Sequence, residues 1–149
     1  MFAPELDVTN LAVSLRFYVE LLGFRLLFER PTHKFAYLER GGVELMIQEA
    51  DGPGRRFRTA PLERPYGRGI SFQLEVDDVD SLHERVVAAG IEIVVPMEER
   101  WYEIDVVEAG GRWQVQGPAE AGNRQFVLAD PDGYLWRPFR DLGVRRATR

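Results

Sequence analysis

The amino-acid sequence predicts an α+β fold made of two modules with the same order: a strand, a helix and three more strands. Two stretches that alternate like strands around turn residues carry this prediction. They are FAYLERGGVELMI at 35–47 and FVLADPDGYLWRPF at 126–139. Their turn glycines, Gly42 and Gly133, are 91 residues apart. This spacing indicates that the chain contains a duplicated module.

The first module begins with a short strand at 5–9, where apolar and charged side chains alternate. A helix with an apolar stripe is expected to run to Leu22, with Asn10 or Ser14 as its N-cap. Gly23 favours a stop directly after the helix. A strand at 24–30 and the two strands of the first hairpin complete the module.

The second module repeats this order after a long connection. Residues 50–67 hold Gly52-Pro53-Gly54 and two further prolines, which is typical of a loop. A helix capped by Asp78 or Asp80 is expected to run to Ala89, with Gly90 closing it. Strands are expected at 70–76, 91–95 and 100–107, an insertion at 110–122, and the second hairpin last.

The two halves also match residue by residue. The stretch DVTNLAVSLRFYVELLGF (7–24) resembles EVDDVDSLHERVVAAGI (75–91) with one gap, so that Val8 matches Val76. Matched helices together with matched hairpins favour an internal duplication. The expected organisation is one domain over 1–149, with a first module at about 3–50, a linker at 51–67 and a second module at about 68–140.

The composition excludes several classes of protein. With 149 residues, 45% hydrophobic and 29% charged, the chain has the size and composition of one ordinary domain with a core. No apolar run approaches the roughly 18 residues of a membrane span, and residues 1–7 lack the features of a signal peptide. The absence of cysteine excludes disulfides and cysteine zinc sites. A soluble cytoplasmic protein without a membrane partner is expected.

The charge distribution argues against nucleic acid as a partner. The net charge is −5, whereas nucleic-acid binding uses clustered Lys and Arg. One segment differs, because residues 51–68 carry five arginines against Asp51 and Glu63, a local net charge of +3. We interpret this segment as a solvated loop.

Three stretches resemble the vicinal oxygen chelate superfamily, and within it the bleomycin-resistance-like branch: PELDVTNLAVSLRFYVELLGF, GISFQLEVDDVDSL and RQFVLADPDGYLWRPF. They follow the order and spacing of that family and cover nearly the whole chain. The resemblance implies the glyoxalase/bleomycin resistance fold, in which paired βαβββ modules form a cup-shaped, mostly antiparallel sheet. It also implies a homodimer.

Enzymes of this superfamily, such as glyoxalase I and extradiol dioxygenases, hold a divalent metal with His and Glu or Gln side chains. The matching positions in this sequence are Ala3, Met46, Ser71 and Arg137. None of these is a ligand for a hard or borderline cation. His33 in a turn and His83 on a helix facing water are interpreted as surface residues. We therefore expect no metal, no other cofactor and no metal-dependent activity.

Strand alternation identifies the side chains that would line the cup. The polar face is expected to carry Ala3, Glu5, Asp7, Glu44, Met46, Gln48, Ser71, Gln73, Glu75, Leu135, Arg137 and Phe139. The opposite face, packed on the helices, is expected to carry Leu6, Val8, Leu45, Ile47, Phe72, Leu74 and Val76. Two interpretations of the polar face stay open: an ordinary solvated sheet face, or a pocket for a polar or cationic ligand.

If the polar face is a pocket, aromatic side chains can add a stacking surface. Trp101 and Tyr102 on a neighbouring strand, and Phe57 from the long loop, are candidates, with core packing as the alternative. Arg137 either pairs with cup carboxylates such as Glu44 or Glu75, or binds an anionic group of the ligand. The candidate ligand-binding residues are Asp7, Glu44, Met46, Gln48, Ser71, Gln73, Glu75, Trp101, Tyr102 and Arg137.

The function expected from these observations is metal-free, non-catalytic binding of a small molecule. By resemblance, the ligand is a bleomycin-type glycopeptide antibiotic or an aromatic metabolite, sequestered in an acidic cup and giving antibiotic resistance. The arginine-rich segment, if it overhangs the cup, favours a different ligand. One alternative is a metal-independent lyase, isomerase or dioxygenase-like enzyme that uses Glu5, Glu44 or Glu75 as acid or base. Another is a protein of regulation or assembly with an empty cup.

Overall fold

A computed structural model describes residues 1–147, and within them two four-stranded sheets form two separate units. The first unit contains Met1–Ile70 together with the turn Asp130–Tyr134. The second contains Ser71–Ala129 and the chain from Leu135 onward. The predicted α+β class is confirmed by these sheets and their few helices.

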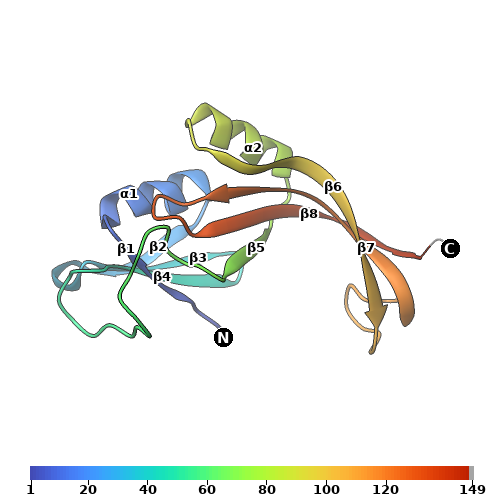
Figure 1. Cartoon of the computed structure of the whole chain (residues 1–149), viewed down its shortest axis with the longest axis horizontal. Coiled ribbons are helices and arrows are strands. Elements are labelled where there is room, and N and C mark those ends of the chain that lie inside the picture. Colours follow the sequence, from blue (N-terminus) through green and yellow to red (C-terminus); the bar gives the residue numbers. More distant parts are fainter. Residues whose placement is uncertain (148–149) are drawn as a thin grey trace. The chain divides into compact units, whose positions relative to one another are not determined.

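The first unit follows the predicted order. Its sheet runs β1-β4-β3-β2, with β1 parallel to β4 and the other neighbours antiparallel. Helix α1 lies against one face of this sheet (Figure 1). Along the chain the elements are β1 (Glu5–Val8), α1 (Leu11–Leu15), η1 (Arg16–Leu21), β2 (Arg25–Arg30), η2 (Pro31–His33), β3 (Phe35–Arg40) and β4 (Val43–Glu49).

The second unit repeats the topology with longer strands. Its sheet runs β5-β8-β7-β6, again with the first pair parallel and the others antiparallel. Helix α2 contacts β7 and β8 (Figure 1). The elements are β5 (Ser71–Glu75), α2 (Val79–Ala88), β6 (Ile93–Val106), β7 (Gly117–Ala129) and β8 (Leu135–Arg146).

The strand register preserves both offsets seen in the sequence. Glu5 pairs with Met46 across β1 and β4, and Gln73 pairs with Arg137 across β5 and β8. Glu5 and Gln73 are 68 residues apart, like Val8 and Val76, and Met46 and Arg137 are 91 apart, like the turn glycines. Since a slip of one residue would turn every side chain to the other face, equal registers give the two sheets equivalent faces.

The first helix starts where the sequence indicates but changes its winding. The Asn10 side chain accepts a hydrogen bond from the Val13 backbone N–H at 3.0 Å, so Asn10 is the N-cap. From Arg16–Leu21 the helix widens into a π-helix, and the Leu22 N–H donates to the Phe17 carbonyl at 3.0 Å. The buried side chains of this segment include Tyr18, whose hydroxyl takes part in the contacts described below.

The second helix is capped by the first of its two candidates. The Asp78 side chain accepts from the Ser81 N–H at 3.0 Å. Its buried residues Val79, Leu82 and Val86 recur at helical spacing. His83, expected to face water, is instead half-buried, with its ring edge-on to a buried phenylalanine, Phe126, at 4.9 Å.

The segment after α2 departs most from the prediction. The strands expected at 91–95 and 100–107 are one strand, β6, with register irregularities around Pro96. Proline has no N–H for the ladder, so the strand bulges there and continues. The expected insertion at 110–122 is wrong in its second half, because β7 begins at Gly117. Small residues make this pairing possible: a Cβ at Gly122 would lie 2.8 Å from the Trp101 indole.

The apolar faces of the sheets lie where alternation places them. Leu6, Val8, Leu45 and Ile47 are at most 5% exposed in the first sheet. In the second, Leu74 and Val76 are buried, and half-buried Phe72 packs 4.8 Å from the Trp136 ring. Among the described residues, no helix combines the length and the apolar character needed to cross a membrane.

Candidate functional site

The polar face of the first sheet carries the candidate residues of β1 and β4. Asp7 and Gln48 are register partners, and the Gln48 amide donates to the Asp7 carboxylate at 3.5 Å. Glu5 and Met46 are the neighbouring pair on the same face, two residues earlier in each strand. Gln48 is only 5% exposed, although it lies on the face expected to be open. A loop accounts for its burial.

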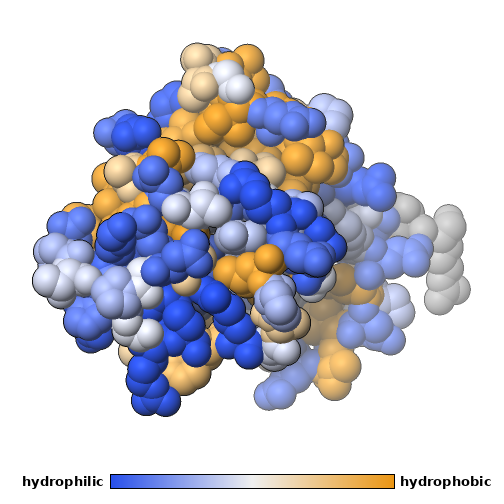
Figure 2. Space-filling view, turned by 60° about the vertical axis from the view of Figure 1, so that its left-hand side comes forward, coloured by the Kyte–Doolittle hydropathy of each residue, from blue (hydrophilic) through white to orange (hydrophobic). Residues whose placement is uncertain are grey.

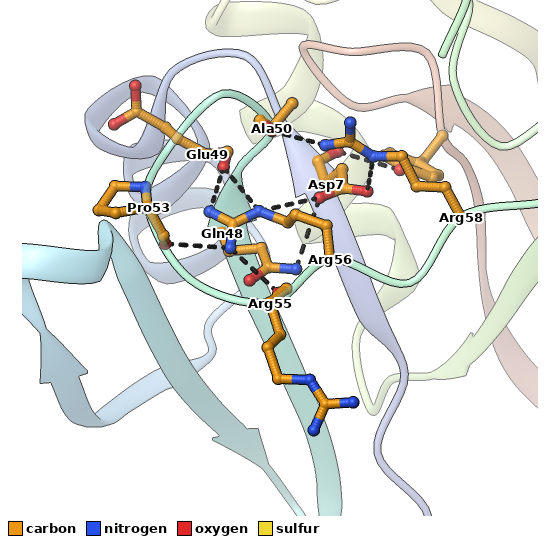
Figure 3. Close-up of polar contacts among 9 residues, drawn as sticks. Asp7, Gln48, Glu49, Ala50, Pro53, Arg55, Arg56 and Arg58 are labelled. Carbon is orange, nitrogen blue, oxygen red and sulfur yellow. Dashed lines mark hydrogen bonds and ion pairs between the residues drawn. The ribbon is translucent and has the colours of Figure 1, made fainter. Parts of the chain in front are cut away.

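Residues 50–58, here called the arginine loop, cover this end of the polar face (Figure 3). Arg56 Nε lies 3.8 Å from Asp7 Oδ1, and Arg58 Nε donates to Asp7 Oδ2 at 3.2 Å. Arg56 also donates to the Glu49 carbonyl at 2.7 Å, and Arg58 to the Ala50 carbonyl at 2.5 Å. The Asp7 carboxylate is therefore held between two guanidiniums.

The contact between the loop and the sheet partly buries these charged side chains. The side chains of Asp7 and Arg56 are each 12% exposed, and that of Arg58 is 29% exposed. The hydrogen bond with Asp7 raises the pKa of the Arg58 guanidinium above its ordinary value. Partly buried pairs of this kind are less screened than surface pairs.

A cavity of about 460 Å³ lies between the sheet and the arginine loop. The strands and η2 supply one wall: Glu5, Arg30, His33, Phe35, Met46 and Gln48. The loop supplies the other: Pro53, Gly54, Arg55, Arg56 and Phe57. Apolar surface from two phenylalanines and a methionine thus lies beside several charged groups, which is typical of a small-molecule site.

The charge of the cavity is opposite to that expected from strand alternation. Its walls hold three guanidiniums, from Arg30, Arg55 and Arg56, against one carboxylate, from Glu5. These four groups give a net charge of about plus two (three minus one), and including the Asp7–Arg58 pair leaves this total unchanged. The side on which the loop lies comes forward in Figure 2, where mostly hydrophilic side chains face the viewer.

Glu44 lies on the same face but outside the cavity. Its carboxylate accepts a hydrogen bond from the Tyr37 hydroxyl at 2.6 Å. This bond raises the pKa of Tyr37, because ionisation would place a second negative charge beside the carboxylate. Tyr37 in turn stacks on the Phe28 ring, with centroids 4.9 Å apart.

In the second unit, the candidate residues of β5 are exposed: Ser71, Gln73 and Glu75. Arg112, from the connection between β6 and β7, donates to the Glu75 carboxylate at 2.7 Å. Arg112 also lies 3.8 Å from Asp141. The segment expected as an insertion therefore supplies a charge partner to this face.

Tyr102 and Arg137 form a polar cluster with Gln125 in the same unit. The Tyr102 hydroxyl accepts from the Gln125 amide at 2.6 Å and from Arg137 Nη1 at 3.3 Å. Arg137 was expected either to pair with a carboxylate or to bind an anionic group of a ligand; among the described residues, its hydrogen bond goes to this hydroxyl. Trp101, the residue before Tyr102, points to the other face, where the Arg145 guanidinium lies 3.8 Å from its ring centroid. Trp101 and Tyr102 therefore do not form one stacking surface.

Most of the chain matches one known protein family. Residues 4–137 match the model of the Glyoxalase/Bleomycin resistance protein/Dioxygenase superfamily. The chain belongs to this superfamily. The resemblance to this superfamily, identified from three sequence stretches, is confirmed.

Several solved structures are similar to this chain over almost its full length. TioX from Micromonospora sp. ML1 is 26% identical, with 95% of this chain and 98% of TioX covered and a TM-score of 0.63. Virulence protein STM3117 from Salmonella typhimurium is 18% identical, with 94% of each chain covered and a TM-score of 0.66. The genomically encoded fosfomycin resistance protein FosX from Listeria monocytogenes is 18% identical, with 95% and 90% covered and a TM-score of 0.60.

The latter two similarities show the fold alone. A comparison with curated protein sequences finds no significant match.

The positions at which superfamily enzymes hold a metal do not fit a cation in this chain. Ala3 lies just before β1, Met46 is in the cavity wall, and Ser71 begins β5. Arg137 brings a positive charge to the fourth position. Within residues 1–147, no group of three or more His, Asp or Glu side chains is arranged to hold a metal ion.

Sequence reasoning missed the arginines that shape the cavity. Alternation placed Asp7, Met46 and Gln48 on one face, but it gave no partner for Asp7 and no role for Arg30 or His33. The signal that was present is the local charge of +3 in residues 51–68. A charged loop beside an acidic face indicates an electrostatic attachment, but it does not say which arginine reaches which carboxylate.

Proposed function

We propose that this protein binds a small organic molecule in the cavity beneath the arginine loop. The observation that supports this is the enclosure of apolar side chains and charged groups in a space of about 460 Å³, the size of ordinary ligand sites. Met46 and Phe35 offer apolar surface on the sheet side, and Phe57 offers it on the loop side. The ligand is sequestered and leaves unchanged, which would suit a role in antibiotic resistance.

The proposal includes a metal-free site and a homodimer. The side chains at the superfamily's metal positions do not fit a cation, so binding is expected to be independent of divalent metals. The alternative, a metal-independent enzyme, needs an acid or base in the cavity, and Glu5 is the carboxylate in its wall. Glu5 is exposed to solvent, whereas the acid or base of such an enzyme usually works in a site closed to water.

Calorimetric titration of glycopeptide antibiotics and aromatic metabolites, with and without EDTA, tests the proposal. The variant Met46→Trp fills the cavity and is expected to weaken binding at least tenfold, roughly 1.4 kcal/mol. Val43→Trp is the matched control, because Val43 is an exposed residue of the same strand outside the cavity wall. Full binding by Met46→Trp, or a ligand that is lost with EDTA, would contradict the proposal. Sedimentation of the native protein tests the dimer.

A further inference from the structure

We infer that the ligand of this cavity is a small organic anion, with a carboxylate, sulfonate or phosphate group on a flat apolar body. The inference rests on the proposed function and names the class of molecule that the same cavity would take. It differs from the cationic ligand expected from the strand faces. The reason lies in which charges of the site already have partners.

Two of the three carboxylates on this face, those of Asp7 and Glu44, already have partners. Asp7 is held by Arg56 and Arg58 at 3.8 and 3.2 Å. The Glu44 carboxylate accepts from the Tyr37 hydroxyl and lies outside the cavity wall. A cationic ligand would have to displace an arginine to reach Asp7.

Two guanidiniums in the cavity wall remain available. Among the described residues, neither Arg30 nor Arg55 forms an ion pair, and both side chains belong to exposed residues. In Figure 3 the Arg55 side chain points away from the Asp7 cluster, while Arg56 reaches into it. The loop thus uses Arg56 and Arg58 for its own attachment, whereas Arg55 lines the cavity.

Aromatic rings hold the two available guanidiniums. The Arg30 guanidinium lies 5.2 Å from the centroid of the Phe35 ring, and that of Arg55 lies 5.0 Å from the centroid of Phe57. A guanidinium stacked on a ring keeps its N–H groups free at its edge for a bidentate contact with an oxyanion. Phe35 is 7% exposed and Phe57 is 72% exposed, so the loop side offers most of the uncovered ring surface.

An anion on a flat ring satisfies both features together. Its charged group pairs with Arg30 or Arg55, and its ring covers exposed Phe57, removing apolar surface from water. The one carboxylate in the wall, from Glu5, is outnumbered by the guanidiniums. A cation of the same shape would meet a net positive wall.

Three probes with one ring system test the charge: naphthalene-2-carboxylate, its neutral carboxamide, and naphthalen-2-ylmethylammonium. Each is titrated into the full chain by calorimetry at low salt and at about 1 M salt, where the screening length falls to about 3 Å. The carboxylate is expected to bind about tenfold tighter than the amide at low salt. The advantage should shrink at high salt, since it comes from charge.

Variants locate the charge that the carboxylate meets. Arg30→Gln and Arg55→Gln are each expected to weaken carboxylate binding roughly three- to fivefold, as for partly exposed ion pairs, and the double variant about tenfold. Binding of the amide should change less than twofold. Arg16→Gln is the matched control: it removes one exposed arginine from the same unit, on η1 away from the cavity wall. It is expected to bind all three probes like the native protein.

The outcomes separate this inference from the proposed function. If the amide or the ammonium binds as tightly as the carboxylate, and Met46→Trp removes that binding, the anion inference is overturned while the cavity remains the site. Carboxylate binding that survives in the Arg30→Gln/Arg55→Gln double variant also overturns it. If none of the three probes binds the native protein, the proposed function itself fails, and the inference fails with it.

Discussion

The turn between β3 and β4 and the turn between β7 and β8 hold equivalent places in the two sheets, yet the first is exposed and the second is buried. Gly41 and Gly42 form the first turn, both with positive φ, and a Cβ added at either would meet nothing within 4 Å. In the second turn, Asp130 and Asp132 are 5% and 1% exposed. The second turn packs into the first unit.

Specific partners make this burial of carboxylates possible. Asp132 accepts from the Thr9 backbone N–H at 3.1 Å and from the Thr9 hydroxyl at 2.6 Å, and Arg64 lies 3.0 Å away. Asp130 accepts from the Tyr18 hydroxyl at 2.5 Å, and it accepts two backbone N–H groups of its own turn. Buried polar groups are tolerated when they are paired. The equivalent turns of the two sheets therefore differ, because buried partners hold the second and the first is open.

The polar faces of the two sheets differ in a similar way. On the first sheet, the arginine loop covers Asp7 and Gln48 and encloses a cavity. On the second, Ser71, Gln73 and Glu75 remain exposed. Equal topology and register therefore give equivalent faces, and the segments that cover those faces decide which one lines a cavity beneath a loop.

The largest expected effect contrasts the two turn glycines. Gly133→Ala combines a positive φ of 105° with a Cβ only 2.8 Å from Pro65 Cα, so strain and overpacking should together cost about 2–5 kcal/mol of unfolding free energy. Gly42→Ala, with a φ of 86° and open space, should cost about 1–2 kcal/mol. Urea unfolding of both variants measures the difference. Equal losses would show that the second turn is not held by its surroundings.

A smaller effect concerns the buried carboxyl of the second turn. Burial raises the pKa of Asp130 above its ordinary 3.8, although hydrogen bonds from Tyr18 and the backbone oppose this. Between 3.8 and the raised value, only the folded protein keeps the proton. The stabilisation that this proton gives to the folded state is therefore fully present below pH 3.8, and it is lost as the pH rises through the raised pKa of the folded protein. Each unit of pKa difference corresponds to about 1.4 kcal/mol.

The variant Asp130→Asn isolates this contribution, because the amide oxygen can still accept the backbone N–H groups. The stability of the native protein relative to Asp130→Asn is expected to rise as the pH falls toward 3.8. Asp80→Asn is a control of opposite sign: Arg124 lowers the pKa of Asp80, so the native advantage there is present above 3.8 and lost in acid. Urea unfolding across a pH series measures both. If the unfolding free energies of the native protein and Asp130→Asn changed in parallel with pH, the raised pKa of Asp130 would be contradicted.

The smallest expected effect concerns the segments that cover the polar faces. Arg56→Gln removes a guanidinium that is 12% exposed and attached to Asp7 and Glu49, so it should cost about 1 kcal/mol. Amide exchange in residues 50–58 should speed up by roughly fivefold. Arg112→Gln breaks the corresponding but 43% exposed contact in the second unit and should change stability by less than about 0.5 kcal/mol. Equal exchange in the two variants would count against an attached loop.

The sequence alone determined the features that depend on neighbouring residues. Alternation placed Leu6, Val8, Leu45 and Ile47 on the buried face, and each helix begins at one of the two caps that the sequence offered, Asn10 and Asp78. These follow from backbone geometry, which repeats every two or 3.6 residues whatever the rest of the chain does. The offset of 91 residues between the hairpins also recurs in the strand register, because Met46 in the first sheet and Arg137 in the second hold equivalent positions.

Only the tertiary structure decided which charges meet. Thr9 and Asp132 are 123 residues apart, and Arg58 reaches Asp7 across 51 residues, so no local pattern links them. The same holds for β7, where residues expected as part of an insertion pair with β6, and Gly122 lies opposite Trp101. The sequence gives the sign of each charge, but only the placement of the loop in the folded chain decides which charges become partners. For that reason the sequence indicated an acidic face, and the folded arginine loop made the cavity on that face positive.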